Sequence, residues 1–357
     1  MLHLRPVQFV DTPVGRDGEV ARLAGGLQWF AAYEVIRGAE RRTVPVAGFD
    51  DFAKALPDPQ AERAALLAHR ISAPRASIQA GERVLRFDQP QAMAILNLTP
   101  DSFSDGGRHD GDPAAAAAAG VDMAAAGAAI IDVGGESTRP GAPTVWEGDE
   151  IARVVPVIER LAASGTPVSI DTRKASVMEA ALAAGAHIVN DVSALLYDDR
   201  AAEVVARAGV PVVLMHSADP KRGAEGAMTG GNALTDCFDW LEARIEAAVA
   251  AGVDRARIIV DPGIGFGKSL ADNLAILNGL SLFHGLGCPL LLGASRKRIV
   301  GALSGEAPVG ARLGGSVMLA VRGADQGAQW LRVHDVPETV QALRVWRGMR
   351  DAALVAR

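Results

Sequence analysis

Residues 128–171 read AAIIDVGGESTRPGAPTVWEGDEIARVVPVIERLAASGTPVSID. Two short runs in this segment, Ala128–Val133 and Pro167–Ile170, are almost continuously apolar, which is typical of parallel strands buried on both faces. Between them, Ile151–Ala163 carries apolar residues at helical spacing. The segment therefore predicts a strand, a helix and a second, parallel strand, which runs directly into the carboxylate of Asp171.

The same alternation extends from residue 92 to the end of the chain. The other apolar runs are Ala92–Leu98, His187–Val189, Val210–Met215, Ile258–Val260, Pro289–Leu292 and Trp330–Val333. They are separated by amphipathic stretches such as Ser176–Ala184, Asp236–Ala251 and Val336–Met349, and an alanine-rich segment, 114–119, is expected to be a packed helix. Eight strand and helix units need roughly 250 residues, and they favour a closed (β/α)8 TIM barrel of the α/β class over a doubly wound open sheet.

A chain of 357 residues is longer than such a barrel requires. We therefore expect two parts, an N-terminal extension over residues 1–88 and the barrel over residues 89–357. Within the extension, Ala80–Pro90 fits a short hairpin that plugs the lower end of the barrel. The rest of the extension fits either a small packed subdomain or a docking arm. Because the predicted strands begin only near residue 92, the barrel is expected to fold without residues 1–74.

Composition and charge argue against several classes of protein. Apolar residues make up 49% of the chain and charged residues 22%, the balance of a globular protein with a large core. A formal charge of −6 argues against bulk attraction to nucleic acid. The N-terminus meets charge and proline too early for a signal peptide, and no run of about 18 uncharged apolar residues could span a membrane. Cys237 and Cys288 lack metal-ligand spacing and are expected to be reduced thiols of a cytoplasmic protein.

Polar side chains stand at or just past the carboxyl ends of the predicted strands, namely Asn97, Asp132, Asp171, Asn190, Asp191, His216, Asp261, Ser295 and His334. In a barrel these ends converge on one mouth, where the active site is built. A single residue of this kind is usually the cap of the next helix or part of a turn. Capping alone is a poor explanation for so many strand ends, so the sequence predicts a site at the mouth.

Residues 261–269, DPGIGFGKS, resemble a phosphate loop but do not form one. Pro262 and Lys268 stand where the two known glycine-rich patterns require glycine. What remains is a strand that ends in Asp261, followed by a glycine-rich turn that lets backbone come close to a flat ligand. Phe266 in this turn is either a stacking surface or part of the core.

The charged residues of the mouth divide into an acidic and a basic group. Asp171 and Asp261 belong to different strands, and neither the nucleophile motif GxSxG nor the zinc motif HExxH accompanies them. They are either a general acid and base or acceptors for the paired N–H groups of a guanidine-like ligand edge. Arg332 and His334 are two residues apart on the last strand and so share a face, close to the usual phosphate site of these barrels. If that face looks into the barrel, both can reach a common anion; otherwise they are a surface charge pair.

Eight motifs resemble those of the dihydropteroate synthase family and occur in the family's order. They are ILNLTPDSFSDGG (95–107), IDVGGESTRPGA (131–142), SIDTRK (169–174), HIVNDVSAL (187–195), VVLMH (212–216), VDPGIGFGK (260–268), GASRK (293–297) and RVHDV (332–336). The resemblance implies a transferase of folate biosynthesis. Such an enzyme condenses 6-hydroxymethyl-7,8-dihydropterin pyrophosphate with p-aminobenzoate, using Mg2+, and forms 7,8-dihydropteroate and pyrophosphate. The resemblance also implies a homodimer formed through outer helices and inhibition by sulfonamides.

The resemblance further implies roles for the residues that match its motifs. The pterin ring is expected to contact Asp171, Asn190, Asp261, Lys297, Met215 and Phe266. The pyrophosphate is expected to contact Asn97, Arg332 and His334, with Asn97 also contacting the Mg2+. The p-aminobenzoate pocket and its loops are expected to contain Phe103, Asp105, Thr138, Arg139, Pro140 and Ser295. The sequence departs from the family in the long glycine-rich stretch Ser217–Leu234, whose contacts stay open.

Two alternative functions stay open. Pterin-binding domains of corrinoid-dependent methyltransferases share the fold and the strand-end Asp and Asn residues. They bind no pyrophosphate, so the SRK and RVHDV motifs argue against them. The second alternative is a catalytically inactive barrel that serves as a binding partner, although no expected substrate-contact residue is missing.

Overall fold

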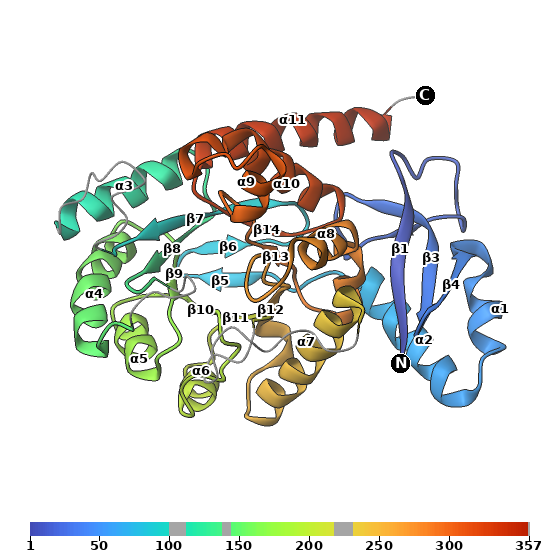
Figure 1. Ribbon diagram of the computed structural model, residues 1–357, viewed down its shortest axis with the longest axis horizontal. Coiled ribbons are helices and arrows are strands. Elements are labelled where there is room, and N and C mark those ends of the chain that lie inside the picture. Colours follow the sequence, from blue (N-terminus) through green and yellow to red (C-terminus); the bar gives the residue numbers. More distant parts are fainter. Residues whose placement is uncertain (100–111, 138–143, 218–230, 356–357) are drawn as a thin grey trace.

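A computed structural model describes residues 1–99, 112–137, 144–217 and 231–355 (Figure 1). Eight parallel strands form one sheet in the order β12-β11-β10-β9-β8-β7-β14-β13. They are β7 (Gln91–Asn97), β8 (Ile130–Gly134), β9 (Val168–Asp171), β10 (Ile188–Asp191), β11 (Val212–Met215), β12 (Ile258–Asp261), β13 (Leu291–Leu292) and β14 (Trp330–Val333). Each overlaps one of the eight apolar runs, so the predicted strands are confirmed.

One parallel bridge closes the sheet into a barrel. Val260 on β12 pairs with Leu290, which directly precedes β13. The Val260 N–H donates to the carbonyl of Pro289 at 2.9 Å, which joins the first strand in the sheet order to the last. The closed ring of eight parallel strands confirms the expected (β/α)8 fold.

Helices cover the outside of the barrel (Figure 1). In chain order the α-helices are α3 (Pro113–Ala125), α4 (Glu147–Ala163), α5 (Ala175–Ala183), α6 (Ala201–Ala208), α7 (Ala233–Ala250), α8 (Leu270–Asn278), α9 (Arg298–Leu303), α10 (Leu313–Asp325) and α11 (Val336–Val355). Short 3-10 segments are η3 (Arg255–Arg257), η4 (Leu280–Leu286) and η5 (Val309–Ala311). The alanine-rich α3 packs closely on α4, because a Cβ on Gly120 would lie only 2.8 Å from Leu161.

A short hairpin fills the amino-terminal end of the barrel. β5 (Ile78–Ala80) and β6 (Arg83–Leu85) pair in antiparallel register. Phe87, which follows the hairpin, is buried with inward-facing side chains at the strand starts, and its ring centroid lies 5.3 Å from that of Trp330. The barrel interior is therefore mainly apolar at this end, whereas the charged residues that face inward lie at the opposite mouth.

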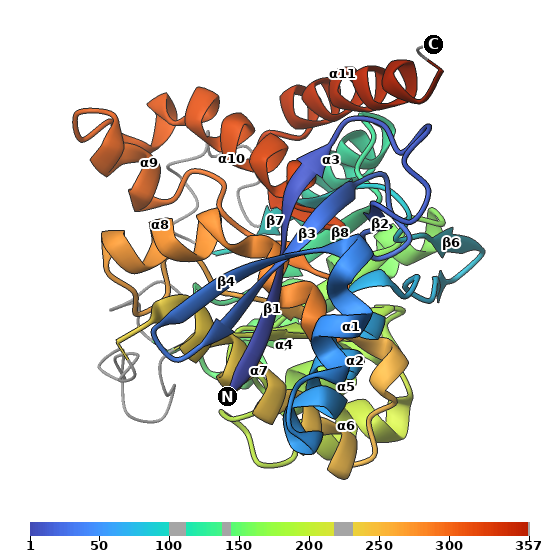
Figure 2. The same ribbon diagram turned by 90° about the vertical axis from the view of Figure 1, so that its right-hand side faces the viewer.

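The residues before the hairpin form a folded unit at one side of the barrel, on the right in Figure 1 and facing the viewer in Figure 2. Its sheet consists of β1 (Leu2–Val10), β2 (Ala21–Arg22), β3 (Trp29–Arg37) and β4 (Glu40–Pro45), followed by η1 (Val46–Gly48), α1 (Phe49–Lys54) and α2 (Asp58–Ser72). The sheet is antiparallel, with β3 in its centre. Phe30, Leu67 and Ile71 of this unit belong to the same hydrophobic cluster as Phe283 of η4. The extension therefore shares its core with the barrel.

Other features of the described residues complete the fold. No helix among them is long and apolar enough to cross a membrane. Cys237 and Cys288 are free and buried. Of the long stretch after β11, residues 218–230 lie outside the described residues, and the chain resumes at the start of α7, where the side chain of Asn232 accepts the Thr235 N–H.

Candidate active site at the barrel mouth

The polar residues of the mouth follow from strand alternation. Side chains two residues apart on a strand share a face. Ile130 and Ile259 face inward near the plugged end, so Asp132 and Asp261 also face inward, one step nearer the mouth. By the same alternation, the inward residues at the strand ends are Asn97, Asp132, Asp171, Asn190, Met215, Asp261 and Arg332.

Arg332 lies at the centre of a buried charge cluster. Its Nε donates to Asp132 Oδ2 and its Nη2 donates to Asp171 Oδ2, both at 2.6 Å. Asn190 Nδ2 donates to the same oxygen of Asp132 at 3.0 Å. The other oxygen of each carboxylate, Oδ1, is buried and has no hydrogen-bond partner among the described residues. Both carboxylates can therefore accept hydrogen bonds from a ligand.

Burial changes the ionisation of this cluster. It raises the pKa of Asp171 to about 7, although Arg332 works to lower it. Burial likewise raises the pKa of Asp261 against the effect of Lys297. Burial also acts to lower the pKa of Arg332, but Asp132 and Asp171 outweigh it and raise that pKa, so Arg332 stays a cation. A carboxyl group whose pKa is raised to about 7 beside a permanent cation, as for Asp171, is typical of functional sites.

The turn after β12 forms the second half of the site. Asp261 Oδ1 accepts the Gly263 N–H at 2.7 Å. Lys297 Nζ donates to the Ile264 carbonyl and lies 4.3 Å from the ring centroid of Phe266. Burial lowers the pKa of Lys297 to about 7, although Asp261 works to raise it. Phe266 is only half-buried, so it belongs to the mouth rather than to the core.

Asn97, Ser295 and His334 are the next residues of the site. Gly134 separates Asn97 from Asp171, since a Cβ at this glycine would lie 3.6 Å from Asn97 Oδ1 and 3.5 Å from Asp171 Cβ. Ser295 Oγ lies 3.2 Å from the backbone nitrogen of His334 and 3.0 Å from its Nδ1. Asn97 thus stands beside the acidic group, and His334 is held against Ser295.

Two polar residues at strand ends do not face the mouth, because each follows an inward-facing residue. The carboxylate of Asp191 accepts the Ser193 N–H at 2.7 Å, the Ser193 hydroxyl at 2.6 Å and the Leu195 N–H at 2.9 Å. The ring of His216 packs edge-on against Trp240 of α7, with centroids 4.8 Å apart. Asp191 therefore organises a turn, and His216 anchors a helix.

Two other residues of the site have no role in the motif-based assignment. Asp132, which the sequence places at the mouth without a specific role, pairs with Arg332. Lys268 binds backbone carbonyls at the turn after β12. Residue types alone do not reveal contacts between a side chain and backbone carbonyls, because every residue has a carbonyl. Phe103, Asp105, Thr138, Arg139 and Pro140, expected around p-aminobenzoate, lie outside the described residues.

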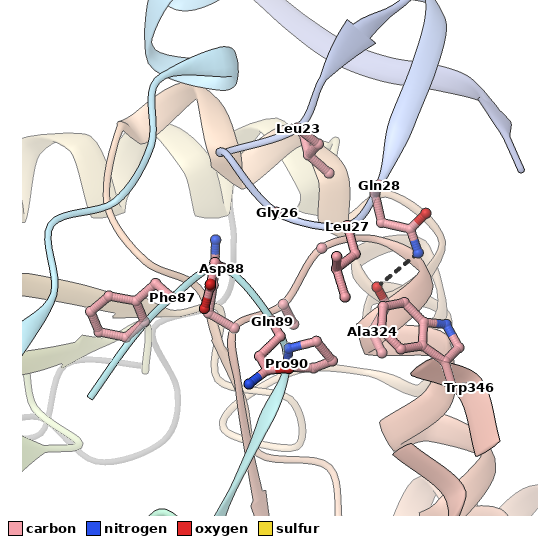
Figure 3. Close-up of a pocket in the computed structure, with 13 residues that line it drawn as sticks. Leu23, Gly26, Leu27, Gln28, Phe87, Asp88, Gln89, Pro90, Ala324 and Trp346 are labelled. Atoms are coloured by element: carbon pink, nitrogen blue, oxygen red, sulfur yellow. Dashed lines mark hydrogen bonds between the residues drawn. The ribbon is translucent and has the colours of Figure 1, made fainter. Parts of the chain in front are cut away.

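A small crevice lies at the plugged end of the barrel, away from the mouth (Figure 3). Leu27 and Gln28 of the extension and Trp346 of α11 line it, together with Pro90 just before β7. Gln28 Nε2 donates to the Ala324 carbonyl at 3.3 Å across this junction. None of the expected site residues lines it.

Comparisons with known proteins agree with this geometry. Residues 93–334 match the family model described as pterin binding enzyme. The dihydropteroate synthase of Bacillus subtilis (strain 168) is 45% identical over 258 residues, which cover 72% of this chain and 87% of that protein. The Xanthomonas albilineans dihydropteroate synthase solved with 4-aminobenzoic acid has a TM-score of 0.71 and 46% identity, and the match covers 77% of this chain and 98% of that one. The Yersinia pestis enzyme solved with a sulfonamide drug has a TM-score of 0.73 and 44% identity, over 78% and 100% of the two chains.

The matched segment begins within β7 and ends just after β14, so it contains most of β7, the other seven barrel strands and the charge cluster around Arg332. The N-terminal extension lies before it. Because the family model matches more than half of the chain, and because relatives more than 40% identical are covered over most of their length, the chain belongs to the dihydropteroate synthase family.

Proposed function

We propose that the barrel mouth condenses 6-hydroxymethyl-7,8-dihydropterin pyrophosphate with p-aminobenzoate to give 7,8-dihydropteroate and pyrophosphate. As a member of its family, the chain is a transferase of folate biosynthesis. The observation that carries the proposal for this mouth is the Arg332 cluster, in which one cation joins two carboxylates that each keep a free oxygen. Such a cluster suits a substrate with N–H donors at one end and an anion at the other.

The acidic group is proposed to bind the pterin ring. Its 2-amino and ring N–H groups form a guanidine-like edge that a carboxylate accepts with two parallel hydrogen bonds. Asp171 offers its free Oδ1 for one of these bonds, and Asp261 and Asn190 add hydrogen-bonding capacity around the ring. Lys297 donates to the ring carbonyl. Phe266 supplies an aromatic face for the pterin. Met215, one of the inward-facing residues at the strand ends, packs beside the pterin ring.

The reaction is proposed to begin with loss of pyrophosphate. The bond between the pterin methylene carbon and the bridging oxygen breaks, and both electrons leave with the oxygen. The aniline nitrogen then donates its lone pair to the methylene carbon and releases a proton to solvent. The protein needs anion stabilisation and exclusion of water more than a strong base. Arg332 and His334, with Asn97, are proposed to bind the departing pyrophosphate.

Mg2+ is part of this proposal. Within the described ranges, no group of three or more His, Cys, Asp or Glu side chains is placed to hold a metal ion. This ion keeps several waters and commonly binds through one or two protein oxygens together with substrate phosphates. The amide oxygen of Asn97, at a strand end beside the proposed pyrophosphate position, fits that mode. When bound, the ion supplies charge neutralisation to the leaving pyrophosphate.

Further parts of the proposal concern the second substrate and the setting of the enzyme. Ser295 is proposed to contact p-aminobenzoate, with Phe103, Asp105, Thr138, Arg139 and Pro140 completing its pocket. Sulfonamides, which share the flat aniline and anionic tail, are proposed inhibitors. We also propose a cytoplasmic homodimer, and a division of the chain into an extension (1–88) and a barrel (89–357).

A pyrophosphate-release assay tests the proposed reaction. Purified protein should release pyrophosphate only when dihydropterin pyrophosphate, p-aminobenzoate and Mg2+ are all present. It should also support growth of a cell that lacks its own synthase. If folded protein fails both tests, the inactive barrel is the better explanation. Tight binding of methyltetrahydrofolate without binding of dihydropterin pyrophosphate would instead favour the methyltransferase-like alternative.

A further inference from the structure

Lys268 holds the turn after β12 through three backbone carbonyls. Its Nζ donates to the carbonyl oxygens of Gly263 at 2.8 Å, His216 at 3.1 Å and Phe266 at 3.2 Å. An ammonium group has three N–H donors and no acceptor, so the three carbonyls match its hydrogen-bonding capacity. One side chain thereby connects the end of β11 to both ends of the Gly263–Phe266 turn.

The backbone of the turn is shaped to present these carbonyls. Gly263, Gly265 and Gly267 have left-handed φ values of 64°, 85° and 65°, which residues other than glycine rarely adopt. A Cβ at Gly263 would lie only 1.9 Å from the His216 carbonyl oxygen, so no larger residue fits there. Because every second residue of the turn has a left-handed φ, the carbonyls of Gly263 and Phe266 both point towards Lys268. Carbonyl dipoles that converge in this way attract a cation, which Lys268 provides.

The same turn carries groups of the proposed pterin site. The Gly263 N–H donates to Asp261 Oδ1 at 2.7 Å, and the ring of Phe266 lies 4.3 Å from Lys297 Nζ. Gly263 and Phe266 therefore each contact Lys268 through a carbonyl and a residue of the mouth through another group. Burial lowers the pKa of Lys268 to about 8, and Asp261 works against that effect.

We propose that Lys268 is a positioning residue for the pterin site, because it fixes the turn that places Phe266 and orients Asp261. This inference rests on the proposed function of the mouth. Lys268 acts through the backbone, since its donors are used by the three carbonyls. Loss of the ammonium removes the Lys268 donor from the His216 and Phe266 carbonyls and leaves the Gly263 carbonyl with the Phe266 N–H at 3.2 Å, so the turn can move relative to the end of β11. The pterin should then bind more weakly, while the contacts of p-aminobenzoate stay in place.

The test compares two buried ammonium groups on different sides of the mouth. Lys268→Met removes the cation beneath the turn. The control is Lys174→Met, because Lys174 Nζ also binds a carbonyl, that of Val145 at 2.6 Å, and the Glu150 carboxylate at 2.7 Å, but it does not contact the turn. Calorimetry with 6-hydroxymethylpterin measures ring binding without turnover. Steady-state kinetics gives the KM for p-aminobenzoate.

We expect Lys268→Met to raise the Kd of the pterin at least tenfold, equivalent to about 1.4 kcal/mol. The KM for p-aminobenzoate should change less than twofold. Lys174→Met should leave the pterin Kd within twofold of wild type. Lys268→Arg, which keeps a charged donor, should recover most of the lost affinity.

Several results would overturn the inference. An unchanged pterin Kd in folded Lys268→Met protein would show that the turn keeps its shape without the cation. Equal rises in the pterin Kd and the p-aminobenzoate KM would show general loosening of the barrel. If Lys268→Met does not fold, Lys268→Gln is judged by the same two criteria. Wild-type protein that binds the pterin but releases no pyrophosphate would count against the proposed reaction alone, whereas wild-type protein that binds no pterin overturns both.

Discussion

Arg332 Nη2 donates to Asp171 Oδ2 at 2.6 Å, between residues 161 positions apart in the sequence. Their strands, β14 and β9, are not neighbours, because β7 and β8 stand between them in the sheet. The guanidinium therefore reaches across the barrel interior and joins the residue proposed for pyrophosphate to a residue proposed for the pterin. Arg332 can thus interact with the pyrophosphate and, through Asp171, with the pterin.

Removal of a pterin-binding carboxylate should weaken ring binding. Asp171→Ala or Asp261→Ala leaves N–H groups of the bound pterin without an acceptor, which costs on the order of 2–5 kcal/mol. Calorimetry with a pterin analogue measures the change. Asp239→Ala is a control, since Asp239 lies on α7 and pairs with His3 of the extension. An unchanged Kd in a folded Asp171 or Asp261 variant would mean that this carboxylate serves only the local fold.

Pterin affinity should be greatest near neutral pH. Asp171 accepts N–H donors when ionised, and its pKa is raised to about 7, so affinity falls as the pH drops below that value. Lys297 donates when protonated, and its pKa is lowered to about 7, so affinity also falls as the pH rises above it. Asp261, whose pKa is likewise raised by burial, adds to the acidic limb.

Variants can separate the two limbs of this profile. Asp171→Asn should flatten the acidic limb, while Lys297→Arg, whose charge does not titrate in this range, should flatten the alkaline limb. Calorimetric titrations from about pH 5.5 to about pH 8.5 give the profile. Affinity that is independent of pH in wild-type protein would contradict the assignment of both groups.

Deletion of residues 1–74 should destabilise the barrel. The positions of the strands in the sequence instead predict that the barrel folds without these residues. The 3-10 segment η4 is buried along its whole length, and Leu67 of the extension lies 3.2 Å from the position of a Cβ on Gly285. The Ser281 hydroxyl also donates to the Pro6 carbonyl at 2.8 Å. Truncation exposes this apolar segment, so insoluble protein or a clearly lower Tm is expected.

A point variant provides the control for this truncation. Arg37 of the extension forms a partly exposed ion pair with Glu40 at 2.9 Å. Arg37→Ala should cost only about 1 kcal/mol, because ion pairs near the surface contribute little. A soluble truncated protein with the wild-type Tm would show that the barrel does not need the extension.

Sulfonamide resistance should arise where a drug extends beyond the outline of p-aminobenzoate. Pro140→Ser is expected to raise the inhibition constant of a sulfonamide more than the KM for p-aminobenzoate, because discrimination is a difference between two binding energies. A tenfold difference requires only about 1.4 kcal/mol. Both constants should be measured on wild type and variant. Equal increases would show that Pro140 shapes the whole pocket rather than its outer edge.

The barrel and its mouth could be predicted because strands carry a simple repeating signal. A parallel strand buried on both faces must be apolar almost throughout, so runs such as Ile258–Val260 stand out. Polar residues directly after such runs have only one common location, the carboxyl end of the barrel. The sequence alone could not decide that Asn190 faces into the barrel and Asp191 faces away from it. That decision requires knowing which face of the strand points inward.

The sequence by itself determined the number and order of the barrel strands and the chemical character of their mouth, because each of these depends on residues that are close together in the chain. Only the tertiary structure decided that Arg332 pairs with Asp132 and Asp171, that Lys268 binds the carbonyls of Gly263 and Phe266, and that the extension covers η4. Two of these contacts join residues far apart in sequence, and the third involves backbone groups that every residue carries. Their formation depends on barrel closure and on backbone dihedral angles. Neither can be inferred from the identity of a single residue.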